Sequence, residues 1–286
     1  MKLTALGVVL LLTLQDKAAP EIEIVRDVVY GQGGTRTIRM HLVRPKAPSQ
    51  PMPVVVYIHG GAWRQGSKEG GVSLLRSLAR KGYLGATIEY RFSQEATFPA
   101  QIEDCKCAIR HLRANAKTYG LDPDRIGVWG SSAGGFLAAL LGTSGGVKEF
   151  EGTGGSPEQS SRVQAVVDWY GPTDFLTMGR NEIDHDAADS PESRLVGGPI
   201  QENREKTAKA SPIAYVTADD PPFLIMHGDK DNLVPLAQSE RLHEALRKAG
   251  VESTLQVLPG QRHGFRDVDV QTPVETFFDR YLKPAK

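Results

Sequence analysis

Cysteine, net charge and long apolar runs are all scarce in this sequence. The 286 residues include two cysteines, and 34 acidic residues balance 34 basic ones, so the formal net charge is zero. A nucleic-acid-binding chain would carry a basic surplus, so we expect no nucleic-acid partner. Cys105 and Cys107 lie two positions apart in an expected helix, where their side chains point to nearly opposite faces. We therefore expect no disulfide, one cysteine in the core and the other half-exposed.

One apolar run stands at the N-terminus, where Leu3 to Leu14 follow Met1-Lys2. A bilayer-spanning helix takes roughly 20 residues, so the run is too short to span a membrane. Its length and positive start match the hydrophobic part of a signal peptide. We expect residues 1–19 to be a signal peptide and the protein to be secreted or periplasmic, with no stable membrane insertion. Residues 20–286 then form a single domain.

From Met52 onward, short β-rich apolar runs alternate with helical patterns, which indicates parallel strands joined by helices. A glycine-rich turn between residues 21–30 and 36–43 predicts an antiparallel hairpin at the sheet edge. The fold class predicted is α/β, with an eight-stranded, mostly parallel sheet flanked by helices. The other six strands are expected at residues 53–58, 84–90, 125–129, 163–169, 222–227 and 254–258.

Helical patterns lie between these strands, and Gly82 and Gly250 occupy expected C-terminal cap positions. A stretch rich in Gly, Ser and Glu at residues 144–162 predicts a surface loop. Residues 175–212 are polar and mixed, which predicts an irregular insertion at the rim of a pocket. The helices are expected at residues 72–81, 100–119, 133–141, 236–249 and 273–282.

The segment Gly130-Ser131-Ser132-Ala133-Gly134 joins an expected strand to an expected helix. A serine at such a sharp turn exposes its hydroxyl, and small neighbours let the backbones approach closely, as in the nucleophile elbow G-x-S-x-G. Ser132 occupies the serine position of this pattern, and Ser131 the variable one. A serine-rich helix cap is the alternative interpretation.

A serine nucleophile needs a base, which follows it in the chain together with an acid in this kind of fold. Four histidines come after Ser132, and His263 lies in the loop directly after the last expected strand. A loop at the carboxyl end of the sheet can reach the elbow. The other three fit local roles: His185 in the polar insertion, His227 at a strand end and His243 on a solvated helix.

The acid would hold the imidazole of the base in the correct tautomer. Asp229 and Asp231 both follow the seventh strand in His227-Gly228-Asp229-Lys230-Asp231. Asp231 lies further into the loop, which favours it, and Asp229 would then make a turn or cap contact. Position alone leaves both open.

His59-Gly60-Gly61-Ala62-Trp63 follows the third strand directly. Adjacent glycines at a strand end let backbone N–H groups turn toward one point, where they can bind an oxyanion together with the N–H of Ala133, the residue after the nucleophile. An ordinary tight turn is the alternative.

Together these segments resemble the α/β-hydrolase serine esterases, and most closely the bacterial feruloyl and acetyl-xylan esterase-like branch related to the hormone-sensitive-lipase-like enzymes. The resemblance covers about residues 24–282. The family pattern H-G-x-x-D-x-x-V-P, matched by residues 227–235, implies that Asp231 is the acid. It also implies oxyanion donors at Gly61, Ala62 and Ala133, with Ala62 in place of a third glycine.

The resemblance implies a carboxylic ester hydrolase with a catalytic triad of Ser132, Asp231 and His263. Trp63 and Phe265, beside the oxyanion loop and the base, are candidate substrate-binding residues. The expected substrate is a small or polysaccharide-linked ester, with short-chain or hydroxycinnamoyl acyl groups such as acetyl or feruloyl.

No cofactor is implied, and the acidic segment around His185 lacks the ligand spacing of a metal site. Two other functions stay open at this point. A serine peptidase of the prolyl-oligopeptidase type shares the catalytic fold but carries a large propeller domain, for which 286 residues leave no room. A non-catalytic binding protein of the same fold would not react with a fluorophosphonate. The oligomeric state is not predicted.

Overall fold

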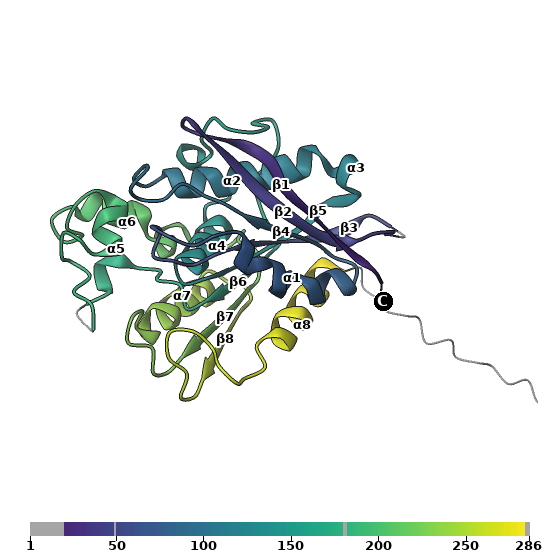
Figure 1. Cartoon of the computed structure of the whole chain (residues 1–286). Helices are drawn as coiled ribbons and strands as arrows, with labels where there is room; N and C mark the ends of the chain where they lie inside the picture. Colours follow the sequence, from purple (N-terminus) through teal and green to yellow (C-terminus); the bar gives the residue numbers. More distant parts are fainter. Residues whose placement is uncertain (1–19, 49, 180–181, 284–286) are drawn as a thin grey trace, which may run out of the picture.

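The structure is a computed structural model that describes residues 20–48, 50–179 and 182–283 (Figure 1). The segment predicted to be a signal peptide, residues 1–19, lies outside the described residues. Within the described part of the chain, no helix is both long enough and apolar enough to cross a membrane.

Eight strands form one sheet in the order β1-β2-β4-β3-β5-β6-β7-β8. The first two pairings in this order are antiparallel and all the others are parallel, so the edge hairpin and the mostly parallel sheet are both confirmed. The strands are β1 Ile22–Gly33, β2 Arg36–Pro45, β3 Met52–Ile58, β4 Leu84–Ile88, β5 Leu121–Ser131, β6 Ala165–Trp169, β7 Phe223–Gly228 and β8 Ser253–Leu258.

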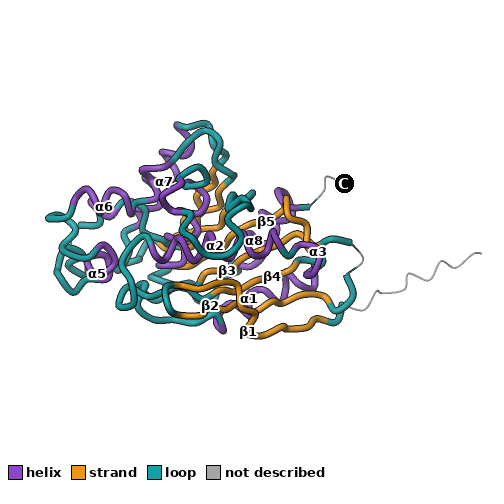
Figure 2. The backbone as a smooth tube through the Cα atoms, turned by 90° about the horizontal axis from the view of Figure 1, so that it is seen from above, coloured by secondary structure: helices purple, strands orange, loops and turns teal. Residues whose placement is uncertain are grey.

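Helices cover both faces of this twisted sheet (Figures 1 and 2). α1 and α8 contribute to the apolar cluster on one face, and α2, α4 and α7 to the cluster on the other. The helices are α1 Glu69–Arg80, α2 Ala100–Ala114, α3 Ala116–Tyr119, α4 Ala133–Thr143, α5 Pro191–Val196, α6 Arg204–Ala210, α7 Leu236–Lys248 and α8 Gln271–Leu282.

Strand β3 shows why both faces must be covered. Its side chains point alternately to the two faces, as the period of a strand dictates. Val54, Val56 and Ile58 therefore join one apolar cluster, while Val55 and Tyr57 join the other. All of them are buried, so the strand is apolar at every position, as parallel strands covered on both faces usually are.

The cysteine prediction was half right. Neither cysteine forms a disulfide, but both are buried, so the expectation of one half-exposed thiol was wrong. The outer side of α2 is covered by the β1 hairpin and a glycine-rich loop. The Cys107 thiol lies 3.5 Å from the carbonyl oxygen of Tyr30, and a Cβ on Gly155 would come within 2.8 Å of its sulfur.

Two helical predictions also need correction. The expected helix at 100–119 breaks at Asn115, which separates α2 from α3. The expected irregular insertion contains α5 and α6, which project at one end of the molecule (Figure 1). α5 begins at Ser190, whose side chain accepts a hydrogen bond from the N–H of Ser193, and ends at Gly197 in the left-handed region. Helices this short carry too few apolar residues to show a period.

Candidate active site

Ser132 lies at the turn between β5 and α4, with backbone angles φ 54° and ψ −121°. An L-residue rarely adopts a positive φ, so the surrounding structure must hold it there. The turn also brings backbones into close contact. A Cβ on Gly130 would lie 2.0 Å from the carbonyl oxygen of Gly134, and one on Gly134 would lie 2.1 Å from that of Ile58. Only glycine fits at either position.

The structure brings Ser132, His263 and Asp231 into one hydrogen-bonded row. Nε2 of His263 lies 2.8 Å from Oγ of Ser132, and its Nδ1 lies 2.7 Å from Oδ2 of Asp231. His263 follows β8 and Asp231 follows β7, so both come from the carboxyl end of the sheet, as does Ser132. A nucleophile, a base and a group that orients the base stand in this geometry in serine hydrolases.

Asp231 is held rigidly as an anion. Its Oδ1 accepts hydrogen bonds from the N–H groups of Leu233 and Val234, both at 2.9 Å. Burial alone would raise the pKa of Asp231, but hydrogen bonds from His227 and His263 outweigh it and hold the pKa well below its usual range. The other candidate acid, Asp229, is exposed and accepts a hydrogen bond from the N–H of Gly260 instead.

The other three histidines that follow Ser132 in the sequence lie beside other residues. His227 is buried and bonds to Oγ of Ser239 and the carbonyl oxygen of Val234. His243 is half-buried rather than solvated, because its Nδ1 lies 2.9 Å from Oγ of Ser253. His185 is buried beside Glu192.

Ser131, the neighbouring serine, points its hydroxyl elsewhere. Its Oγ lies 3.1 Å from the hydroxyl oxygen of Tyr57 on β3. The side chain of Ser132, not that of Ser131, is therefore the one that meets His263.

The loop of residues 59–63, which is predicted to bind the oxyanion, packs directly against the turn that carries Ser132. A Cβ on Gly60 would lie 2.8 Å from the carbonyl oxygen of Ser131, and Gly61, Ala62 and Trp63 all have positive φ. Ala133 is the first residue of α4, so its N–H has no partner within the helix. Ala62 and Ala133 line the same pocket as Ser132, whereas Gly61 does not.

Two hollows meet at His263. On the Ser132 side of His263 lies a small pocket of about 80 Å³. On the other side of His263 lies an open, more polar hollow of about 710 Å³. They share Leu233 and His263 and no other lining residue. The small pocket is lined by Ala62, Trp63, Ser132, Ala133, Pro172, Ile183, His185, Pro191, Glu192, Leu233, Val234 and His263.

Trp63 and Phe265 differ in their positions. Trp63 is 2% exposed and packs edge-on against Phe136 and Phe175, and it also lines the small pocket. Phe265 lines neither hollow; it packs edge-on against Trp169 and Tyr170. Of the two candidate substrate-binding residues, Trp63 thus lines the small pocket, and Phe265 lines neither hollow.

Tyr170 is the residue that the motifs did not assign. Its ring centroid lies 4.8 Å from that of His263 and 4.8 Å from that of Phe265, so it supports the imidazole from one side. Its position directly after β6, at the carboxyl end of the sheet, is the signal that could have identified it.

The insertion between β6 and β7 does reach the pocket, as predicted, through Ile183, His185, Pro191 and Glu192. Among the described residues, no group of three or more His, Cys, Asp or Glu side chains could hold a metal ion.

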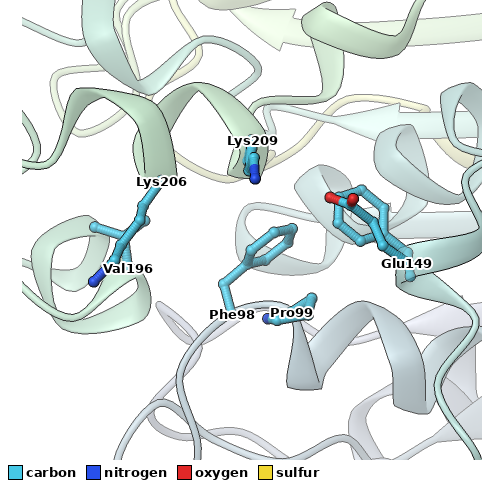
Figure 3. Close-up of a pocket in the computed structure, with 7 residues that line it drawn as sticks. Phe98, Pro99, Glu149, Val196, Lys206 and Lys209 are labelled. Carbon is cyan, nitrogen blue, oxygen red and sulfur yellow. The ribbon is translucent and has the colours of Figure 1, made fainter.

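A separate hollow of about 330 Å³ lies between the insertion and the segments before α2 and after α4 (Figure 3). Lys209 extends into it from α6, opposite Phe98 and Glu149, and both Lys206 and Lys209 are exposed. It shares no lining residue with the pocket at Ser132. Its lining consists of Phe98, Pro99, Glu149, Phe150, Val196, Lys206 and Lys209.

This chain is similar to several proteins that are named as esterases. The BD-FAE family model matches residues 40–246. The probable carboxylic ester hydrolase LipM of Mycobacterium tuberculosis is 34% identical over 245 residues, which cover 84% of this chain and 56% of that protein. This chain thus spans little more than half the length of that relative.

Two solved structures share the fold. A truncated form of a carbohydrate esterase from gut microbiota aligns with a TM-score of 0.82 and 33% identity, covering 90% of this chain and 95% of that one. An acetyl ester-xyloside bifunctional hydrolase from Caldicellulosiruptor lactoaceticus aligns with a TM-score of 0.70 and 25% identity, covering 86% and 89%. The resemblance to α/β-hydrolase serine esterases is therefore confirmed, and the chain belongs to the BD-FAE family.

Proposed function

We propose that this chain is a carboxylic ester hydrolase that acts by two-step acyl transfer. The observation that carries the proposal is the hydrogen-bonded row of Ser132, His263 and Asp231. The esterase relatives support the same reaction.

In the first step Ser132 Oγ attacks the ester carbonyl carbon while Nε2 of His263 takes its proton. Asp231, held as an anion, stabilises the imidazolium that forms. The carbonyl oxygen becomes an oxyanion, and we assign its binding to the N–H groups of Gly61, Ala62 and Ala133. One such donor contributes about 3 kcal/mol to the stability of the transition state in a comparable site.

His263 then protonates the leaving alcohol, whose departure completes the first step and leaves the acyl group on Ser132. In the second step water attacks this acyl-enzyme with His263 again as the base. The carboxylic acid leaves and Ser132 regains its proton. The ester bond between Ser132 and the acyl group forms and is hydrolysed within one cycle, so the enzyme returns to its starting state.

The sizes of the two hollows favour an ester substrate that has one small half and one large polar half. An ester carbonyl at Ser132 would direct its two halves toward a pocket of about 80 Å³ and an open hollow of about 710 Å³. Asn232, Gln261 and Arg262 line the larger hollow, and such polar side chains suit a sugar. We propose acetyl or similarly short esters of a carbohydrate, rather than feruloyl esters, as the substrate class.

The proposal is tested by replacing each of the two adjacent serines in turn. We expect Ser132→Ala to lower kcat for p-nitrophenyl acetate by about ten-thousand-fold or more. The matched control is Ser131→Ala, which should keep activity within about threefold, because its hydroxyl bonds to Tyr57. A fluorophosphonate should label the wild type and the control but not Ser132→Ala. Hydrolysis by Ser132→Ala at near the wild-type rate would refute the proposal.

A further inference from the structure

The small pocket beside Ser132 contains a buried polar pair. His185 is 2% exposed and Glu192 is 4% exposed, and both line the pocket together with Ser132 and His263. They belong to the insertion between β6 and β7 and lie seven positions apart in the sequence. Neither side chain has a role in the two-step reaction.

A local hydrogen-bond network fixes where the two side chains stand. Oγ of Ser190 donates to the carbonyl oxygen of His185 at 2.7 Å and accepts from the N–H of Ser193 at 3.0 Å. This links the His185 backbone to the first turn of α5, which carries Glu192. The two side chains are therefore held against the pocket by the fold of the segment.

Three polar atoms of these two side chains nevertheless lack hydrogen bonds. His185 Nδ1 lies 3.0 Å from Oε2 of Glu192, but the two groups are not aligned for a hydrogen bond. Among the described residues, neither ring nitrogen of His185 nor Oε2 of Glu192 has a hydrogen-bond partner. The indole N–H of Trp63, which lines the same pocket, also lacks one.

Such a concentration of unsatisfied groups requires an explanation. Leaving one buried polar group without a partner costs about 1–3 kcal/mol, and native proteins contain few of them. Here four such atoms belong to three residues that line one pocket beside the nucleophile. A ligand that supplies their missing partners would explain their arrangement.

The chemistry of the four atoms defines that ligand. Oε2 of Glu192 accepts a hydrogen bond, the Trp63 indole donates one, and a neutral His185 ring can do either with its two nitrogens. A hydroxyl donates one hydrogen bond and accepts up to two, so it can provide partners for up to three of these four atoms. A methyl group would leave all four unsatisfied, and a carboxylate would be repelled by Glu192.

We propose that His185 and Glu192 are specificity-determining residues that bind a hydroxyl group of the ester substrate beside the carbonyl that Ser132 attacks. The hydroxyl belongs either to the alcohol half, as on a sugar, or to the acyl half. This inference rests on the proposed esterase function and assigns a substrate feature to it.

Two matched pairs of small esters test the proposal, because the members of each pair differ only by a hydroxyl in place of a methyl. Propyl acetate and 2-hydroxyethyl acetate probe the alcohol half, while propyl propionate and propyl glycolate probe the acyl half. The measurement is kcat/KM in a pH-stat, divided by the rate of alkaline hydrolysis of each ester. The wild type should prefer the hydroxyl member of one pair by at least about tenfold, since a site built for a hydroxyl discriminates strongly against its absence.

The variants separate recognition from a structural role. Glu192→Leu and His185→Phe should lower kcat/KM for the hydroxyl member of the responsive pair much more than for its methyl member, and so bring the preference close to one. Glu192→Gln, which keeps an acceptor oxygen, should retain part of the preference and serves if the apolar variants fail to fold. A structural role would lower both members of the pair equally.

The outcomes separate this inference from the function on which it rests. A wild type that hydrolyses all four esters without any preference for a hydroxyl would overturn the inference and leave the esterase proposal standing. A preference that survives both apolar variants would overturn it as well. A wild type that hydrolyses none of the four esters, nor p-nitrophenyl acetate, would instead contradict the esterase proposal.

Discussion

Asp231 is the most strongly constrained residue of the site. Oδ1 accepts two backbone N–H groups, and Oδ2 lies 2.7 Å from Nδ1 of His263 and 3.2 Å from Nε2 of His227. These contacts lower its pKa despite the burial, so Asp231 is ionised at neutral pH. In the proposed reaction this anion keeps the proton of His263 on Nδ1 and leaves Nε2 free to accept the serine proton.

We therefore expect Asp231→Asn to lower kcat for p-nitrophenyl acetate by about a thousandfold to ten-thousandfold. The amide can present its NH₂ group to Nδ1 and so favour the tautomer that has its proton on Nε2. The matched control is Asp229→Asn, two positions earlier, whose exposed side chain bonds to the N–H of Gly260. Comparable losses in the two variants would contradict the assigned role of Asp231.

The sequence placed the residues of this row at one edge of the sheet because each one follows the end of a strand. Ser132, Asp231 and His263 come one, three and five residues after β5, β7 and β8. Position alone left Asp229 and Asp231 both open, and the choice of Asp231 came from the resemblance to the family pattern. Glu192 and His185 could not be assigned in this way. Their position depends on how the segment between β6 and β7 folds back over the pocket, and no short pattern encodes that path.

At the scale of elements, β6 carries an unusual charge in the middle of the sheet. Asp168 is fully buried; its Oδ1 accepts the N–H of Gly171 at 2.9 Å, while its Oδ2 has no hydrogen-bond partner among the described residues. Burial raises the pKa of Asp168 from the ordinary 3.8 to about 6, against the opposing effects of Gly171 and of His227. The folded protein therefore binds a proton here more tightly than the unfolded chain.

Because its pKa is raised in the folded protein, protonated Asp168 contributes to the free energy of unfolding. This contribution is fully present below pH 3.8 and is lost as the pH rises through about 6. Above that range the buried charge costs about 3 kcal/mol, because one pKa unit corresponds to about 1.4 kcal/mol. Asp168→Asn removes the charge but buries an amide donor, so we expect it to stabilise the fold by about 2 kcal/mol at pH 7.5.

Urea unfolding of the wild type and of Asp168→Asn between pH 4 and pH 7.5 measures this difference. The gain should shrink steadily as the pH falls, because the wild-type carboxyl then becomes neutral. Asp189→Asn, at an exposed position, should change the free energy of unfolding by less than about 0.5 kcal/mol at every pH. A variant that is less stable than the wild type at pH 7.5 would show that the charge of Asp168 is needed by the fold.

The elements themselves differed in how well they could be predicted. Buried strands such as β3 and long helices such as α7 show continuous apolar runs or a helical period, so their type was clear from the residues. α5 and α6 have six and seven residues and lie in a polar segment. Their stability depends on caps and on contacts with the rest of the fold, and these are not visible in a short window of sequence.

At the scale of the whole molecule, the sheet separates two apolar clusters, which contain different tryptophan and cysteine side chains that can report on unfolding. Trp63, Cys105 and Cys107 belong to one cluster, and Trp129 and Trp169 belong to the other. Both thiols are buried, and burial raises the pKa of Cys107 to about 11. Roughly one Cys107 in a thousand would then be a thiolate at pH 8, which adds low reactivity to poor access.

If residues 20–286 form one cooperative domain, the two clusters must come apart together, because they share every central strand of the sheet. We expect both thiols to resist DTNB at pH 8 in the native protein and to react over the same urea range in which tryptophan fluorescence changes. The variants Cys105→Ala and Cys107→Ala assign the reactivity to each thiol. Labelling of Cys107 at clearly lower urea would show that the β1 hairpin and the glycine-rich loop open before the sheet does, and that the chain unfolds in more than one unit.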